Sequence, residues 1–250
     1  MSIIFFLLSI IPLSMIIRYM FNRRKEDGLY QKSCKISLKQ GLLCVLPILA
    51  VAAVFAIINR ILELTVLKNA NELISVAMKD FIVAVFAEEV VKFSVLKGVL
   101  KRKINAYTWA DVVAFMVIIG TGFGLVEDIP YAIGASPAEM LIRGFTLGHV
   151  GYAFIMGWFY GKRLYTGKKG YTAAAFLIPF SLHGLYDFSL SPEFLKLNDN
   201  LAAIPLSLAV VDIVLLVLIF RFFKRSKNRE RYNTPLIPAE ESGNPEQITL

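Results

Sequence analysis

The stretch Phe81–Leu100, FIVAVFAEEVVKFSVLKGVL, decides the class of this chain. It is an apolar run long enough to cross a bilayer, and yet Glu88, Glu89 and Lys92 lie near its middle. If the crossing begins near Asp80, a rise of ~1.5 Å per residue puts both glutamates roughly 12–14 Å deep in a hydrocarbon core of about 30 Å. Charged groups at that depth cost ~2.5–3.5 kcal/mol, so they face the protein interior or water and are candidates for function. Glu88 and Lys92 lie four residues apart and share one helix face, and Lys92 can form an ion pair with Glu88 or with Glu89.

The composition indicates an all-α polytopic transmembrane helical bundle. Hydrophobic residues make up 56 % of the 250 residues, above the 45–50 % that is usual for a soluble domain. Several apolar runs reach the length of a membrane span. We predict about seven spans, at residues 2–20, 41–59, 76–98, 108–133, 139–160, 171–190 and 201–221.

The basic residues predict the topology. Of the 27 lysines and arginines, 21 fall in segments 18–40, 97–103, 161–170 and the stretch after Phe220, while loops 60–80 and 191–200 hold four. The positive-inside rule therefore places the N-terminus outside and the C-terminus in the cytoplasm. The net charge of +8 then reflects contact with anionic lipid, and we expect no nucleic-acid partner.

Two regions follow from this pattern. Residues 1–224 are predicted to form one membrane-embedded domain, with the residues that suggest chemistry between 80 and 190. Residues 225–250, rich in charge and in proline, are predicted to form a disordered cytoplasmic tail.

Polar residues gather at similar depth on four predicted spans. Both histidines of the chain belong to this set, which comprises Glu88, Glu89, Lys92, Glu127, His149, His183 and Asp187. Carboxylates and imidazoles around a wet cavity suit hydrolysis, since one group can take a proton from water and another can stabilise an oxyanion. The two cysteines show no metal or disulfide pattern, and no HExxH spacing occurs, so we predict neither a metal nor another cofactor.

Four short motifs carry a family resemblance. EEVVK at 88–92 resembles the EExxK motif of the PrsW family of intramembrane proteases, FGLVE at 123–127 its FxxxE motif, and HGLYD at 183–187 its HxxxD motif. FTLGH at 145–149 resembles the FxxxH motif of the wider superfamily that contains the type II CAAX prenyl endopeptidases. Those prenyl endopeptidases carry EExxxR, whereas Phe93 stands at that arginine position here, and their last motif ends in asparagine rather than in Asp187. Both departures favour the PrsW branch.

The resemblance implies a glutamate-dependent membrane endopeptidase in the bacterial plasma membrane. It implies that Glu88 activates water with support from Glu89, that His149 shares this water and that His183 binds the oxyanion. Lys92, Glu127 and Asp187 would then be supporting residues. The implied partner is a single-span anti-sigma factor, whose first (site-1) cut begins the release of a stress-response sigma factor.

Other functions also fit the buried charges. Chains of buried glutamate, histidine and aspartate serve as proton relays in proton-coupled transporters, although no inverted repeat is visible in this sequence. A non-catalytic scaffold is a further alternative, because the same superfamily includes an assembly subunit of γ-secretase. Glu88 and Lys92 taken alone are also compatible with a structural ion pair between helices.

Overall fold

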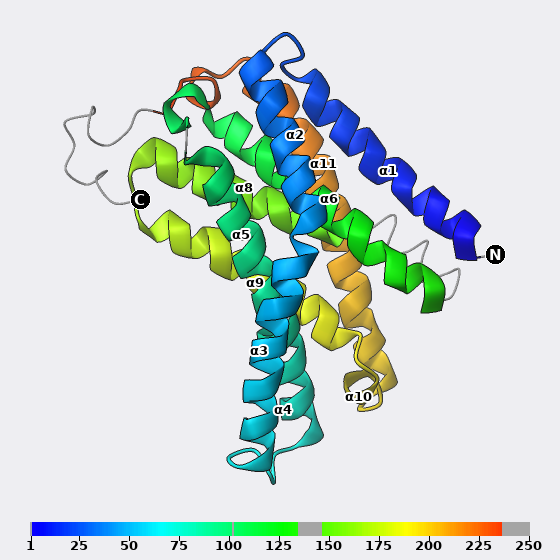
Figure 1. The fold of residues 1–250 in the computed structure, drawn as a ribbon. Coiled ribbons are helices and arrows are strands. Elements are labelled where there is room, and N and C mark those ends of the chain that lie inside the picture. Colours follow the sequence, from blue (N-terminus) through cyan, green and yellow to red (C-terminus); the bar gives the residue numbers. More distant parts are fainter. Residues whose placement is uncertain (1, 102, 135–146, 237–250) are drawn as a thin grey trace.

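The computed structural model describes residues 2–101, 103–134 and 147–236, and these are helical almost throughout (Figure 1). Within those ranges the β-structure is limited to one isolated bridge between Thr108 and Pro235. The predicted all-α class is therefore confirmed. The longer helices are α1 (Ser2–Asn22), α2 (Gly28–Leu43), α3 (Val45–Leu64), α5 (Phe86–Leu100), α6 (Trp109–Gly134), α8 (Gly148–Thr166), α9 (Gly170–Ser189) and α11 (Ala203–Ser226). The shorter ones are α4 (Glu72–Ala77), the π-helix η1 (Met78–Val85), α10 (Pro192–Leu195) and the 3-10 turns η2 (Ile104–Ala106), η3 (Asp199–Ala202) and η4 (Glu230–Tyr232).

Three helical stretches in the described part are long and apolar enough to cross a membrane: Gly28–Leu64, Trp109–Pro130 and Ala203–Ser226. The first joins α2 and α3 into one rod, interrupted only at Cys44. Pro47 explains this interruption, because its ring clashes with the carbonyl four residues earlier. The predicted segment 139–160 begins outside the described residues, and the number of spans and the orientation of the termini stay predictions.

Helix α6 is the centre of the bundle. Its residues 112–119 are completely buried, and it packs against α1, α2, α5 and α8. The approach of α8 is close at Gly120, where an added Cβ would lie 2.5 Å from the Cβ of Ala153 and 2.6 Å from the backbone oxygen of His149. Glycine at this position thus lets α6 and α8 touch through their backbones beside His149.

Helices α3 and α11 carry much of the exposed apolar surface of the described residues. On α3 it consists of Leu46, Leu49, Val54, Ile57, Ile58, Ile61 and Leu64. On α11 it consists of Ile204, Leu206, Val210, Val211, Ile213, Val214, Val217, Leu218 and Phe220. Apolar faces of this extent are costly in water and suit contact with lipid chains.

The basic segments meet at one end of the bundle, opposite the α3–α4 hairpin (Figure 1). Arg24, in the turn between α1 and α2, pairs with Asp111 of α6 at 2.5 Å. Trp109 stacks on Tyr165 at the end of α8, with ring centroids 5.7 Å apart.

The predicted disordered tail is ordered as far as Leu236. The Leu236 amide donates to the Tyr107 carbonyl oxygen at 2.8 Å, and the Tyr232 ring lies 4.8 Å from the Trp109 ring. Both tail residues are buried, so their apolar side chains hold this segment against the start of α6. Residues 225–236 are therefore packed in this structure, and residues 237–250, the rest of the predicted tail, lie outside the described part.

Candidate active site

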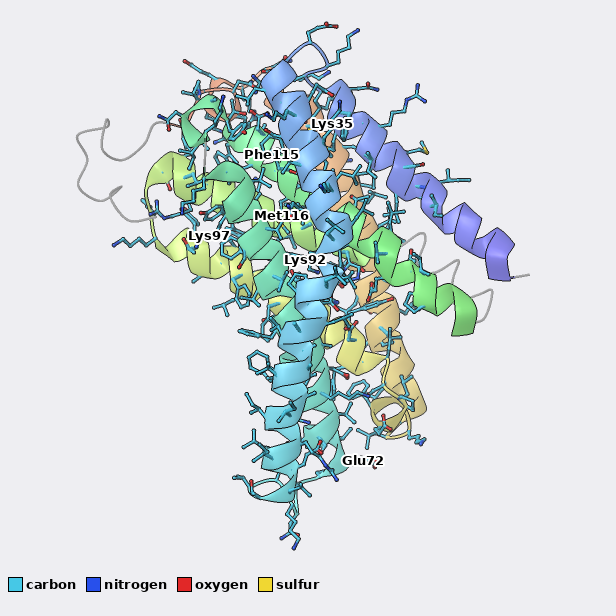
Figure 2. The ribbon with its side chains drawn as sticks, viewed as in Figure 1. Lys35, Glu72, Lys92, Lys97, Phe115 and Met116 are labelled. Atoms are coloured by element: carbon cyan, nitrogen blue, oxygen red, sulfur yellow. The ribbon has the colours of Figure 1, made fainter. Side chains whose placement is uncertain are left out.

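Glu88 and Glu89 lie in the first turn of α5, and Lys92 follows one turn later. The π-helix η1 leads directly into this turn. π-Helical segments are rare in proteins, and those that occur often lie at functional sites. Figure 2 shows Lys92 near the middle of the bundle, between Lys35 toward one end and Glu72 toward the other. The Lys92 side chain is 1 % exposed, so its charge must be balanced by the protein.

Lys92 contacts both glutamates. Its Nζ lies 2.5 Å from Oε1 of Glu89 and 3.4 Å from Oε2 of Glu88. The same ammonium lies 3.4 Å from Nδ1 of His149 and faces the Phe123 ring, 4.7 Å from its centroid. The predicted pairing is confirmed for both glutamates, and the shorter contact goes to Glu89.

His149 is held at its two ring nitrogens. Nε2 hydrogen-bonds the carboxylate of Glu127 on α6, and Nδ1 faces Lys92 and Glu88. When Nε2–H donates to Glu127, Nδ1 keeps a lone pair that can accept a hydrogen bond from Lys92 or from water. Leu147, just before α8, adopts the left-handed conformation with φ 49°, a strained state that is often found next to functional residues.

His183 is held by residues of three helices, α5, α8 and its own helix α9. Its Nδ1 lies 3.0 Å from Oε1 of Glu89, and its Nε2 lies 3.5 Å from Oδ2 of Asp187, one turn later on α9. Tyr152 of α8 stacks on the ring, with centroids 4.9 Å apart and planes 22° apart. Phe81 of η1 packs so closely on α9 that a Cβ at Gly184 would lie 2.4 Å from its ring. These contacts fix α9 against η1 and α5, which aligns His183 with Glu89.

Three of these side chains converge on one point. Oε2 of Glu88 lies 3.9 Å from Nδ1 of His149 and 3.9 Å from Nε2 of His183. These separations are too long for direct hydrogen bonds and suit a small molecule between the three atoms. An adjoining cavity of about 50 Å³ is lined by Glu127, His149, Tyr152, His183, Tyr186 and Asp187, among others. Such a volume, with this many polar groups, can hold water.

The comparisons with known proteins identify the family. The family model described as "PrsW family intramembrane metalloprotease" matches residues 40–220. The chain belongs to the PrsW family. This stretch contains every residue of the polar cluster, so the resemblance drawn from the four motifs is confirmed.

Curated PrsW relatives support the same assignment. The chain is 29 % identical to Protease PrsW of Clostridioides difficile over 209 residues, covering 78 % of this chain and 82 % of that protein. It is 30 % identical to Protease PrsW of Geobacillus kaustophilus over 120 residues, covering 46 % of this chain and 53 % of the relative. No solved structure matches the chain. Membership in the PrsW family makes this chain a membrane protease.

The description of the PrsW family names a metal, and part of the cluster has suitable donors. One ligand atom from each of Glu88, Glu89, His149 and His183 lies within 4.8 Å of the others. Imidazole and carboxylate are common zinc ligands. The Lys92 ammonium, however, contacts three of these four side chains at 2.5–3.4 Å. Its positive charge, placed among the candidate ligands, repels a divalent cation, so this arrangement does not fit a metal.

The structure brings all seven predicted site residues into one cluster. Glu88, Glu89, His149 and His183 form its centre with Lys92, while Glu127 and Asp187 contact the two histidines. Sequence reasoning missed Tyr152, because a single tyrosine within an apolar span carries no signal of its own. It also gave Phe81 no role, although this ring positions α9. Asp212 of α11, which has no motif, lies beside Tyr152 at the edge of the cluster, where both approach Gly148.

Proposed function

We propose that this chain is a glutamate-dependent endopeptidase of the bacterial plasma membrane that makes the site-1 cut in a single-span anti-sigma factor. The observation that carries the proposal is the convergence of Glu88 Oε2, His149 Nδ1 and His183 Nε2 beside a cavity that can hold water. The site-1 cut, which activates a stress-response sigma factor, is proposed from the resemblance to the PrsW family.

Water is activated between Glu88 and His149. A water at the convergence point donates one hydrogen to Nδ1 of His149 and the other to the Glu88 carboxylate. As its oxygen attacks the carbonyl carbon of the scissile peptide, Glu88 takes the proton as general base. Glu127 holds the His149 ring in the required tautomer through Nε2.

His183 stabilises the developing oxyanion. Its Nδ1–H donates to Glu89, and a proton on Nε2 then allows the ring to donate to the former carbonyl oxygen. Asp187, 3.5 Å from Nε2, orients the ring. Glu88 next passes its proton to the leaving amide nitrogen as the carbon–nitrogen bond breaks, which yields a carboxylic acid and an amine and restores the enzyme. The acid then gives its proton to the amine, so the products leave as a carboxylate and an ammonium group.

Lys92 and Glu89 support this chemistry through charge. The Lys92 ammonium lies between the two glutamates and balances them in a site where water is scarce. Glu89, 1 % exposed, accepts hydrogen bonds from both Lys92 and His183. Because Lys92 also contacts Glu88, Glu89 connects the general base Glu88 with His183, the donor to the oxyanion. Losing Glu89 would therefore disturb both halves of the reaction.

The test is cleavage of a tagged single-span anti-sigma factor from the same genome, co-expressed with each variant. Glu88→Gln keeps the shape of the side chain and removes its basicity. Glu26→Gln is the matched control, because the Glu26 side chain is 89 % exposed and pairs only with Lys25 among the described residues. We expect a shortened fragment with the wild type and with Glu26→Gln, and none with Glu88→Gln.

Other outcomes would change the assignment. A fragment that is equally abundant with Glu88→Gln would contradict the glutamate mechanism. Full signalling activity both in cells that carry Glu88→Gln and in cells that carry Glu89→Gln would favour a scaffold. Proton flux in liposomes that depends on substrate and survives Glu88→Gln would favour a transporter. No fragment with any variant would overturn the choice of substrate.

A further inference from the structure

A second cavity lies away from the protease site, between the basic-end portions of α8 and α11. Its volume is about 480 Å³. Phe154, Ile155, Trp158 and Phe159 line it from α8, and Leu215, Leu218 and Phe222 line it from α11. At one end its lining consists of Arg221, Arg225, Arg229 and Arg231, with Tyr232. We call this cavity the arginine groove.

The arginine groove separates apolar from basic residues along its length. Leu215 and Arg225 are ten residues apart on α11, which corresponds to about 15 Å along the helix axis. The residues near Leu215 are apolar, whereas the end near Arg225 lies where the basic segments of the bundle meet. Phe222 packs against Tyr232, with ring centroids 5.0 Å apart, and so joins the helix to the segment that follows it.

The charges at the basic end of the groove are not neutralised by the described part of the chain. The side chains of Arg221, Arg225 and Arg229 are exposed and form no ion pair with a described residue. Segment 221–232 contains six basic residues and one acidic residue, Glu230. Arginine prefers phosphate, which its planar guanidinium can bind through two hydrogen bonds at once.

We propose that the arginine groove binds one anionic phospholipid, with an acyl chain along the apolar residues and the phosphate among the arginines. The order of the lining matches such a lipid, because acyl chains lie deep in the bilayer and phosphates lie at its surface. Basic pockets between membrane helices bind anionic head groups in the same way. A basic surface alone would attract anionic lipid without a fixed number of bound molecules, whereas the groove takes one.

The test uses the full chain, purified in neutral detergent, and native mass spectrometry with added phosphatidylglycerol or phosphatidylcholine. The test variant combines Arg221→Gln, Arg225→Gln and Arg229→Gln. The control variant combines Lys32→Gln, Lys35→Gln and Lys39→Gln on α2, which removes the same charge from exposed positions. We expect one tightly bound phosphatidylglycerol in the wild type and the control, and about 100-fold weaker binding in the arginine variant, or roughly fivefold per arginine.

A second variant tests the apolar part of the groove. Leu218→Trp adds volume to a lining residue and leaves every arginine in place. We expect it to weaken phosphatidylglycerol binding at least tenfold without changing the charge. Equal binding by the arginine variant and the wild type, or equal losses in the arginine and lysine variants, would overturn the proposal. So would tight binding of phosphatidylcholine that matches that of phosphatidylglycerol.

Two other occupants give distinct results. If the wild type binds no phosphatidylglycerol but a full chain with Glu240→Gln, Glu241→Gln and Glu246→Gln does, then the acidic C-terminal segment fills the groove and the lipid proposal is wrong. If the arginine variant converts a dimer into monomers and leaves lipid binding unchanged, the groove is an interface between two copies. Either result would overturn the assignment to lipid.

Discussion

Tyr152 stacks on His183 with ring centroids 4.9 Å apart and planes 22° apart. The two residues belong to neighbouring helices, α8 and α9, and Tyr152 is 3 % exposed. The stacking limits the rotation of the His183 imidazole, which we propose donates a hydrogen bond to the oxyanion. Tyr152 is therefore a positioning residue, although it lies in none of the sequence motifs.

We predict that Tyr152→Ala lowers kcat about tenfold with little change in KM, as expected when a group that orients a reacting residue is lost. Tyr152→Phe keeps the stacked ring and should restore most of the rate. Initial cleavage rates on a purified substrate measure both variants. Wild-type rates for Tyr152→Ala would show that the stacking has no part in the reaction.

Lys92→Met should destabilise the protein by about 3–5 kcal/mol, because it leaves Glu89 buried without its closest cation. The double variant Lys92→Met with Glu89→Gln removes both charges and should regain much of that stability while staying inactive. Denaturant titration in detergent micelles measures the free energy of unfolding. Lys35→Met, at an exposed position, is the control and should unfold like the wild type. An unchanged stability for Lys92→Met would contradict the buried ion pair.

Gly184→Ala should lower both stability and activity. Its new Cβ would lie 2.4 Å from the Phe81 ring, so either this ring or helix α9 must move. Overpacking of this kind costs about 1–3 kcal/mol. Combining it with Phe81→Leu should recover part of the loss, because the smaller side chain gives room. Gly98→Ala, where no atom lies within 4 Å of the added Cβ, should be neutral or stabilising.

Glu127→Gln should reduce cleavage about 10- to 100-fold without abolishing it. The amide oxygen can still accept from Nε2 of His149, but it no longer carries the charge that strengthens this bond. Glu127→Ala removes the acceptor and should be more severe. Kinetics on the same substrate separate the two variants from Glu88→Gln, for which we expect no activity. Equal rates for Glu127→Ala and the wild type would exclude a role for this contact.

Chelation tests the position of Lys92 in the cluster. Because its ammonium contacts three of the four side chains that could bind a metal, we expect the purified enzyme to stay active after treatment with a chelator. Elemental analysis should find less than one zinc per chain. If activity is lost on chelation and returns with zinc, Lys92 must leave the cluster in the active state and the mechanism requires a metal.

The sequence by itself determined the helical class, the family and the seven residues of the cluster. Helix periodicity explains this success for Glu88, Glu89 and Lys92, which share one turn and are neighbours in any helix. For the histidines the motifs were sufficient, since a polar residue within an apolar span must turn toward other polar groups.

Only the tertiary structure decided which atoms meet. Sequence spacing allowed Lys92 to pair with either glutamate, and the shorter contact proved to go to Glu89. The stacking of Tyr152 on His183 depends on how α8 and α9 are rotated, and the packing of Phe81 on Gly184 depends on how closely η1 approaches α9. Rotation and approach arise from the fit of side chains between helices far apart in the sequence, which no local pattern records. The same reason explains why the folding back of residues 227–236 onto α6 could not be predicted.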